Sequence, residues 1–240
     1  MAASETDAFI DLERFRALVE ERFGLSLEEH PEHLSRFVRQ RMHATGCATF
    51  GAYELFLTAS SEARAEFRTI VESLTVGETH FFRNGDHFRA LVDHALPERL
   101  GKAPAHGPIR VLSVGCASGE EAYTIAILVR ENFAHLGAAD VWLRGIDLNP
   151  AAVSRAKRAR YSSWSLRETP ERIREKYFRS VGNEIHLNDD IRVMVSFEER
   201  NLFDGDARFW APSSFDIVFC RNVVIYFNQE RVNDADHSCV

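Results

Sequence analysis

The sequence has little cysteine, no long apolar run and no basic leader. Its four cysteines are Cys47, Cys116, Cys220 and Cys239, which form no CxxC pair and no Cys/His cluster with zinc spacing. Neither a disulfide framework nor a metal site is therefore expected. No apolar run reaches the roughly 18 residues that a membrane-spanning helix needs, and the N-terminus has no secretory pattern. These absences favour the reducing cytoplasm and exclude membrane insertion.

A large positive charge is also lacking. The 240 residues include 29 Lys and Arg against 36 Asp and Glu, a formal net charge of −7, and the pI is about 5.8. This balance argues against a general nucleic-acid binder. A hydrophobic share of 45% is typical of a globular chain, and the length allows one or two domains.

The first 75 residues show the periodicity of amphipathic helices in their apolar residues. Apolar residues recur at three- and four-residue steps around residues 9–19, 34–42, 50–57 and 67–74, with a break at Pro31. Such spacing places them on one face of a helix. We therefore expect an all-helical domain over residues 1–76.

From about residue 108 the pattern changes to that of an α/β fold. Short apolar runs at 109–114, 141–147, 191–197 and 215–220 predict strands, and helices are expected at 120–133 and 150–160. Strands that alternate with helices indicate a mainly parallel sheet. The second domain is expected to cover residues 77–240.

The strongest motif is VLSVGCASGEE at residues 111–121, where a strand leads through a Gly-x-Ala-x-Gly turn into a helix. Small residues let a ligand approach the amides of such a turn. Asp147 ends the next strand, where a carboxylate can accept hydrogen bonds from both hydroxyls of a ribose. The pair indicates a nucleoside cofactor, although a tight turn with a capping aspartate gives the same pattern.

Two carboxylates, Glu120 and Glu121, follow the turn directly. They would repel a pyrophosphate and tolerate a cation such as the ammonium of a methionine group. This favours S-adenosylmethionine over NAD, although acidic residues are common in first turns for dipole reasons alone.

Polar residues that could contact a ligand also follow three other apolar runs. Arg83 follows two phenylalanines in LTVGETHFFR, and Arg221 and Asn222 follow the apolar run FDIVFC. Asn201 and Leu202 follow the run at 191–197, where an amide can pair with an adenine edge and a leucine can cover the ring. Each set also has a plain structural explanation, because a neighbouring loop can supply the partners that buried polar groups need.

The order FFR, GCASGEEAY, ID, NL and FDIVFCRNVVIYF resembles the CheR-type chemotaxis receptor methyltransferases, over about residues 11–228. These are S-adenosylmethionine-dependent protein-glutamate O-methyltransferases. The resemblance implies an all-helical N-terminal domain, a Rossmann-like methyltransferase domain, and a small antiparallel β-subdomain around residues 180–197. It also implies S-adenosylhomocysteine as the product and the cytoplasmic helices of methyl-accepting chemoreceptors as partners.

The resemblance further implies which residues form the site. The residues expected to contact the cofactor are Gly77, Thr79, Arg83, Gly115, Ala117, Glu121, Asp147, Asn201, Leu202, Arg221 and Asn222. Arg83 and Tyr226 are expected to orient groups close to the reactive methyl. A glutamate substrate is already ionised at pH 7, so no general base is assigned, and His80 is given no such role.

The chain departs from the family in three places. Gly77 stands where the family often has Asn. The segment 178–187 looks too short for the glycine-containing insertion of receptor-tethered members, so binding of a receptor C-terminal pentapeptide is not expected. After Tyr226 the family continues through a helix, a Gly-Gly turn and final strands, whereas this chain stops at Val240, so the sheet is expected to lack strands.

Partner docking and two rival functions stay open. Arg36, Arg39 and Arg41 gather on the second expected helix, where they form either a docking face for acidic receptor helices or a solvated surface. One rival is a methyltransferase with another substrate, a small molecule or RNA. The other is a cofactor-binding regulatory module that is inactive because of its short C-terminus. A nicotinamide dehydrogenase is disfavoured by Glu120 and Glu121.

Overall fold

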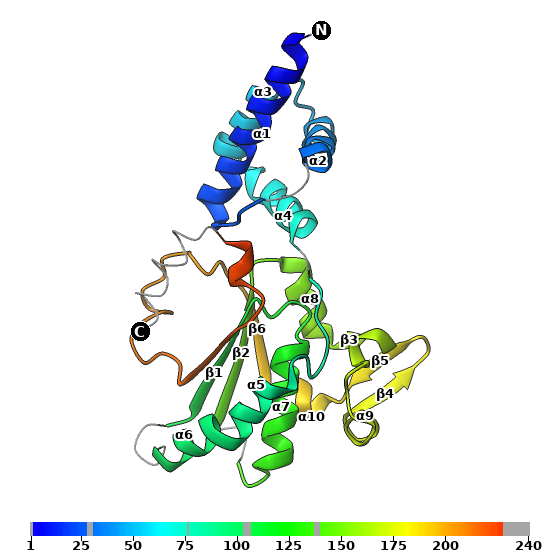
Figure 1. The fold of residues 1–240 in the computed structure, drawn as a ribbon, viewed down its shortest axis with the longest axis vertical. Coiled ribbons are helices and arrows are strands. Elements are labelled where there is room, and N and C mark those ends of the chain that lie inside the picture. The colour runs from blue at the N-terminus through cyan, green and yellow to red at the C-terminus, as the bar shows by residue number, and fades with distance from the viewer. Residues whose placement is uncertain (1, 28–30, 76, 103–106, 137–139, 228–240) are drawn as a thin grey trace. The chain divides into compact units, whose positions relative to one another are not determined.

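The computed structural model describes residues 2–27, 31–75, 77–102, 107–136 and 140–227. It divides into two compact units, Met1–Leu74 with Val224–Val240, and Thr75–Val223. Figure 1 shows the elements of both units. The expectation about missing C-terminal strands concerns residues 228–240, which lie outside the described residues.

The first unit contains the four expected helices, which are α1 (Ala2–Phe23), α2 (Pro31–Ala44), α3 (Phe50–Ala59) and α4 (Ala63–Leu74). Pro31 begins α2, where a missing N–H costs nothing. The hydroxyl of Thr49 caps α3 by accepting from the Ala52 amide at 3.2 Å. The periodicity of the apolar residues therefore predicted this unit correctly.

A buried ion pair corrects the expectation for Arg41. Its Nε and Nη2 donate to the two carboxylate oxygens of Glu66 at 2.8 and 2.6 Å, and the Tyr53 hydroxyl donates to the same carboxylate at 2.6 Å. Burial acts to raise the pKa of Glu66, but these bonds outweigh it and lower the pKa. Arg41 is therefore committed inside the unit, whereas Arg36 and Arg39 are exposed.

The second unit is an α/β fold that confirms the predicted class. A helical stretch that the sequence did not predict comes first, in α5 (Gly85–Ala90), the π-helix η1 (Leu91–Ala95) and α6 (Leu96–Lys102). The main sheet and its helices follow as β1 (Ile109–Val114), α7 (Glu120–Asn132), β2 (Val141–Asp147), α8 (Pro150–Arg158), α10 (Asp189–Arg192), β6 (Val195–Glu199) and β7 (Ile217–Cys220).

The main sheet has the order β6-β2-β1-β7, and all its neighbouring strands are parallel. In sequence the order is third, second, first, fourth, which is the doubly wound arrangement. Val114 at the end of β1 pairs with Ile146 on one side and Cys220 on the other. The strand order therefore reverses between β1 and β7, and ligands of such sheets bind outside the carboxyl ends at this point.

A small antiparallel sheet confirms the expected subdomain but not its bounds. It has the order β3-β5-β4, formed by β3 (Arg160–Tyr161), β4 (Phe178–Val181) and β5 (Glu184–Leu187), with η3 (Ser163–Leu166) and α9 (Glu171–Tyr177) between β3 and β4. The expected range of 180–197 was wrong, because residues 195–197 belong to β6 of the main sheet. A two-residue strand such as β3 is too short to show alternation. The β4–β5 turn is two residues long, as short as expected.

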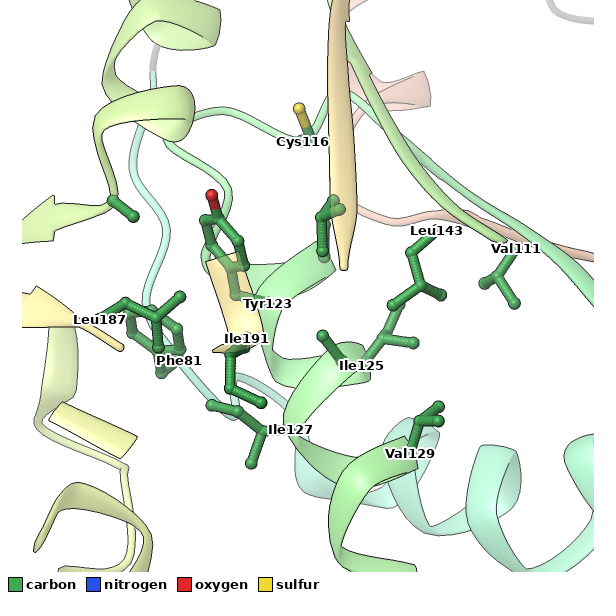
Figure 2. Close-up of a cluster of buried hydrophobic side chains, with 14 of the residues drawn as sticks. Phe81, Val111, Cys116, Tyr123, Ile125, Ile127, Val129, Leu143, Leu187 and Ile191 are labelled. Carbon is green, nitrogen blue, oxygen red and sulfur yellow. The ribbon is translucent and has the colours of Figure 1, made fainter. Parts of the chain in front are cut away.

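The core of the second unit lies between α7 and the sheet (Figure 2). Its fully buried members include Tyr123, Ile125 and Ile127 of α7. The Phe81 ring joins them from the FFR segment and meets Tyr161 and Phe178 edge-on, with centroids 4.8 and 4.9 Å apart. This packing anchors the FFR segment to the small sheet.

Candidate cofactor-binding site

Most of the predicted cofactor contacts lie at the carboxyl ends of the four parallel strands. Gly115 and Ala117 follow β1, Asp147 ends β2, and the Asn201–Leu202 and Arg221–Asn222 pairs follow β6 and β7. The topology therefore brings these segments, far apart in sequence, to one edge of the sheet.

Asp147 connects the end of β2 to the glycine turn. Its Oδ2 accepts from the Ala117 amide and its Oδ1 from the Asn149 amide, both at 2.8 Å. Burial raises the pKa of Asp147, and the two amides and the Arg155 charge oppose this rise. A carboxylate offers about four acceptor positions. Asp147 therefore retains acceptor capacity for a ligand hydroxyl.

The two glycines of the turn have close packing neighbours that the sequence did not indicate. Gly115 has φ +60°, and a Cβ there would lie 2.3 Å from Cγ2 of Val223. Gly119 has φ +92°, and its Cβ would meet Ala156 and Phe197 at 3.0 Å. Both glycines therefore allow protein side chains to pack against the turn, and contact of the turn with a ligand stays a prediction. The Ala117 amide is likewise used by Asp147.

The two acidic residues after the turn differ in their surroundings. Glu120 is 1% exposed, and its Oε2 accepts from the Ser118 hydroxyl at 2.8 Å. Burial raises its pKa, against the effect of bonds from Ser118 and Ser165. The Glu121 side chain is 15% exposed, and its Oε1 accepts from the Ser113 hydroxyl at 2.7 Å. Glu121 is therefore the carboxylate of this pair that can meet a cation.

Arg221 ties the end of β7 to the FFR segment. Its Nη2 donates to the Arg83 carbonyl and, at 3.2 Å, to Oδ1 of Asn84. Its Nε lies 3.6 Å from Oε2 of Glu121, and its guanidinium lies 5.0 Å from the centroid of the Phe88 ring. Burial lowers the pKa of Arg221, and Arg83 adds to this while Glu121 opposes it. Nη1 is buried without a hydrogen-bond partner in the described part of the chain.

Strained backbone gathers in the same segments. Phe82, Asn84, Ala117 and Asn222 have φ between +47° and +62°, and they make up four of the six non-glycine residues with positive φ among those described. Such residues persist only where their surroundings enforce the conformation, and they are concentrated at functional sites. This clustering supports the strand ends as the site.

The remaining predicted contacts lie in the FFR segment, residues 77–84, which include Phe81, Phe82 and Arg83. Gly77 is exposed, and a Cβ there would lie 3.7 Å from Nη2 of Arg155, so the position has room for the Asn that the family often carries. Thr79 is half-buried, and Arg83 donates from Nη1 to the Glu78 carbonyl at 3.0 Å.

His80 is occupied inside the fold. The His80 Nδ1 lies 2.6 Å from Nη2 of Arg167, and its Nε2 lies 2.9 Å from Oε1 of Glu168. A guanidinium can only donate, so Nδ1 is the acceptor and the ring is assigned as the neutral Nε2–H tautomer. This supports leaving His80 out of the chemistry.

The last three predicted residues are Asn201, Leu202 and Tyr226. Asn201 accepts from the Phe203 amide at 3.0 Å in a turn, and Leu202 packs against the cluster of Leu112, Val114, Ile146 and Phe209. The backbone of Tyr226 lies in η4 (Val224–Tyr226), but its side chain lies outside the described atoms. The role of Tyr226 stays a prediction.

Two residues near the site were missed. Ser113 could have been found, because it is a polar residue inside the apolar run IRVLSV. Arg155 acts electrostatically on both Asp147 and Glu120, but a basic residue late in a helix gives no distinguishing signal. In the described ranges, no group of three or more His, Cys, Asp or Glu side chains could hold a metal ion, and no helix could cross a membrane.

The doubly wound sheet and the carboxylates at its strand ends define a Rossmann-like nucleoside-binding domain. Comparison with known families specifies it further. Residues 77–235 match the CheR methyltransferase SAM-binding domain, and residues 10–75 match the CheR methyltransferase all-alpha domain. The chain belongs to the CheR methyltransferase family, and S-adenosylmethionine is its cofactor.

Curated relatives support the same family. The chain is 33% identical over 224 residues to a probable biofilm formation methyltransferase, WspC, of Pseudomonas putida, covering 92% of this chain and 51% of the relative. It is 30% identical to chemotaxis protein methyltransferase 2 of Vibrio cholerae (91% and 75% covered) and 31% identical to the chemotaxis protein methyltransferase of Escherichia coli (90% and 73%). The chain thus spans about half to three quarters of the length of these relatives.

Proposed function

We propose that the chain methylates glutamate side chains of chemoreceptors and releases S-adenosylhomocysteine. The observation that carries the proposal is the arrangement of Asp147 at the end of β2 and Glu121 in the first turn of α7, in a domain that matches the family's SAM-binding model. When bound, S-adenosylmethionine supplies a methyl group on a positively charged sulfur.

The residues present fit this cofactor. Asp147 retains acceptor capacity for ribose hydroxyls, and Glu121 offers Oε2 to the ammonium of the methionine group. The unpartnered Nη1 of Arg221 is a donor suited to the methionine carboxylate. Asn201 and Leu202 are proposed for the adenine side. Gly77 and Thr79 are proposed to contact the cofactor from the FFR segment.

The chemistry requires alignment more than proton transfer. A glutamate nucleophile has a pKa near 4.3 and is already ionised at neutral pH, so the chain supplies no base. Its task is to place that carboxylate in line with the methyl and sulfur, and positioning of this kind contributes roughly 7–11 kcal/mol. Arg83 is proposed to orient the reacting groups, together with Tyr226. Excluding water also helps, because opposite charges disappear in the reaction.

A transfer assay tests this function and separates it from its rivals. Labelled S-adenosylmethionine is offered with a chemoreceptor cytoplasmic fragment and, separately, with RNA. Label that enters the receptor as a base-labile ester is the expected result. Label in RNA would support a different substrate, and binding of S-adenosylhomocysteine in calorimetry without any transfer would support the regulatory module.

The receptor is proposed to dock on the exposed arginines of α2. Arg36 and Arg39 remain available, whereas Arg41 is paired with Glu66. Reversing both charges with Arg36→Glu and Arg39→Glu is expected to raise the apparent KM for the receptor fragment and to leave cofactor affinity unchanged. An unchanged KM would refute this docking face.

Two further expectations follow from the same assignment. The two-residue β4–β5 turn supports the absence of a pentapeptide tether, and measurable binding of such a peptide in calorimetry would contradict this. The cytoplasm is proposed as the compartment, since Cys47 and Cys116 are free thiols in the part of the chain that the structure describes. The names of the relatives include both chemotaxis and biofilm formation, so the receptor system has to be found by the transfer assay.

A further inference from the structure

Ser113 is a polar residue in the interior of an apolar strand. Its neighbours in β1 are Leu112 and Val114, and Ser113 itself is 1% exposed. It pairs in register with Gly145 on β2 and Phe219 on β7, so it has a strand on each side. A buried hydroxyl costs free energy unless it is hydrogen-bonded. Packing of the sheet therefore does not explain a serine here.

The hydrogen bond of Ser113 goes to the predicted site. Its Oγ donates to Oε1 of Glu121 at 2.7 Å. The other carboxylate oxygen, Oε2, forms an ion pair with Arg221, whose Nε lies 3.6 Å away, beyond hydrogen-bond distance. One oxygen of Glu121 is thus fixed by the strand, while no described hydrogen bond uses the other.

We propose that Ser113 is a positioning residue for the ammonium group of the cofactor, because its hydroxyl orients the Glu121 carboxylate and leaves Oε2 to bind that cation. The inference rests on the proposed function. It assigns Ser113 no contact with the ligand and no part in methyl transfer.

The electrostatics of Glu121 agree with this geometry. Burial raises the pKa of Glu121, and the Ser113 bond, with the charges of Arg221 and Arg83, opposes the rise. The hydroxyl therefore favours the ionised carboxylate, which is the form that attracts a cation. Without the hydroxyl, the pKa of Glu121 is expected to rise further, and the carboxylate is free to rotate and to hydrogen-bond Arg221, with which it already forms an ion pair.

Two ligands that differ by the amino-acid group test the inference. S-adenosylhomocysteine carries the ammonium, whereas 5′-methylthioadenosine keeps the nucleoside and thioether but lacks it. In calorimetry on the full chain, Ser113→Ala is expected to raise the Kd for S-adenosylhomocysteine about tenfold, the loss expected for a hydrogen bond to a charged group. The Kd for methylthioadenosine is expected to stay within about twofold.

Matched variants separate positioning from folding. Ser113→Cys keeps nearly the size of serine but is a weak hydrogen-bond donor, so it is expected to show the same selective loss of S-adenosylhomocysteine affinity, and it replaces Ser113→Ala if that variant folds poorly. Ser113→Thr keeps the hydroxyl and is expected to retain most of the affinity. Ser196→Ala on β6 removes a hydroxyl that donates to the Leu143 carbonyl at 3.3 Å and is expected to change neither Kd. In a Glu121→Gln background, Ser113→Ala is expected to have no further effect.

Several results would overturn the inference. Equal loss of both ligands would show that Ser113 only supports the fold, and an unchanged Kd for S-adenosylhomocysteine would show that it does not act through Glu121. If Ser113→Ala weakened S-adenosylhomocysteine binding by the full tenfold in the Glu121→Gln background too, this would also show that Ser113 does not act through Glu121. Failure of the unaltered chain to bind S-adenosylhomocysteine would instead reject the proposed function itself.

Discussion

Glu131 stabilises the second unit by joining the end of α7 to α9. Its Oε1 accepts from Lys176 Nζ and the Tyr177 hydroxyl, both at 2.6 Å, and its Oε2 accepts from Arg172. Burial acts to raise the pKa of Glu131, but bonds from Lys176, Tyr177 and Arg172 outweigh it and lower the pKa to about 2. Glu131→Gln removes the charge with little change of shape, so it isolates this electrostatic contribution.

The magnitude follows from linkage. A fall in pKa from an ordinary value near 4.5 to about 2 corresponds to about 3 kcal/mol if nothing screens it. The Glu131 side chain is 8% exposed, but Arg172 and Lys176 are 71% and 54% exposed, so water and salt weaken the attraction. We therefore expect Glu131→Gln to lower the free energy of unfolding by about 1–2 kcal/mol at pH 7.

The pH dependence has a definite sign. Because the pKa of Glu131 is lowered in the folded state, its contribution is complete above the unfolded value near 4.5 and is lost as pH falls toward 2. Urea unfolding followed by tryptophan fluorescence measures it, since Trp142, Trp164 and Trp210 all lie in the second unit. The difference between the unaltered chain and the variant is expected to be constant from pH 7 to 5.5 and smaller at pH 3.5.

The control for this experiment lies on α9, the helix that carries the partners of Glu131. Glu175→Gln changes an exposed carboxylate of α9 and is expected to alter stability by less than about 0.5 kcal/mol. A gap between Glu131→Gln and the unaltered chain that stays constant down to pH 3.5, or that ignores added salt, would refute the reasoning.

Three other perturbations have expected outcomes. Gly115→Ala is expected to cost about 2–4 kcal/mol in urea unfolding, because the position has φ +60° and a Cβ there meets Val223; adding Val223→Ala should recover only the steric part. Glu66→Gln is expected to cost about 2–3 kcal/mol in thermal unfolding followed by circular dichroism, and no loss would contradict the buried pair. Asp147→Asn is expected to weaken S-adenosylhomocysteine binding about tenfold or more in calorimetry, and unchanged affinity would exclude Asp147 from the site.

The order of the elements could be predicted from the sequence where periodicity is strong. The four helices of the first unit each contain one of the predicted apolar stripes, and strands β1 and β2 have the predicted bounds. Prediction failed where elements are short or irregular. The two residues of β3 cannot show alternation, and the π-helix η1 interrupts the helical spacing of residues 85–102.

The candidate site was predictable by position and less so by contact. Asp147 ends β2 and Glu121 lies in the first turn of α7, as their places in the sequence indicated. The sequence could not show that Gly115 accommodates Val223, or that Arg41 pairs with Glu66, since both contacts join segments far apart in the chain. Long-range packing of this kind depends on the three-dimensional arrangement and leaves no local pattern.

The left-handed residues of the site have a consequence for how the second unit loses its structure. Phe82, Asn84, Ala117 and Asn222 each hold a conformation that costs a residue with a side chain about 1 kcal/mol or more. Together they store about 4 kcal/mol, a sizeable share of the roughly 5–15 kcal/mol by which a domain is stable. When heat or a distant substitution loosens the packing around them, these four residues gain most by relaxing. The segments where the cofactor site is proposed are therefore expected to lose their native backbone early in unfolding.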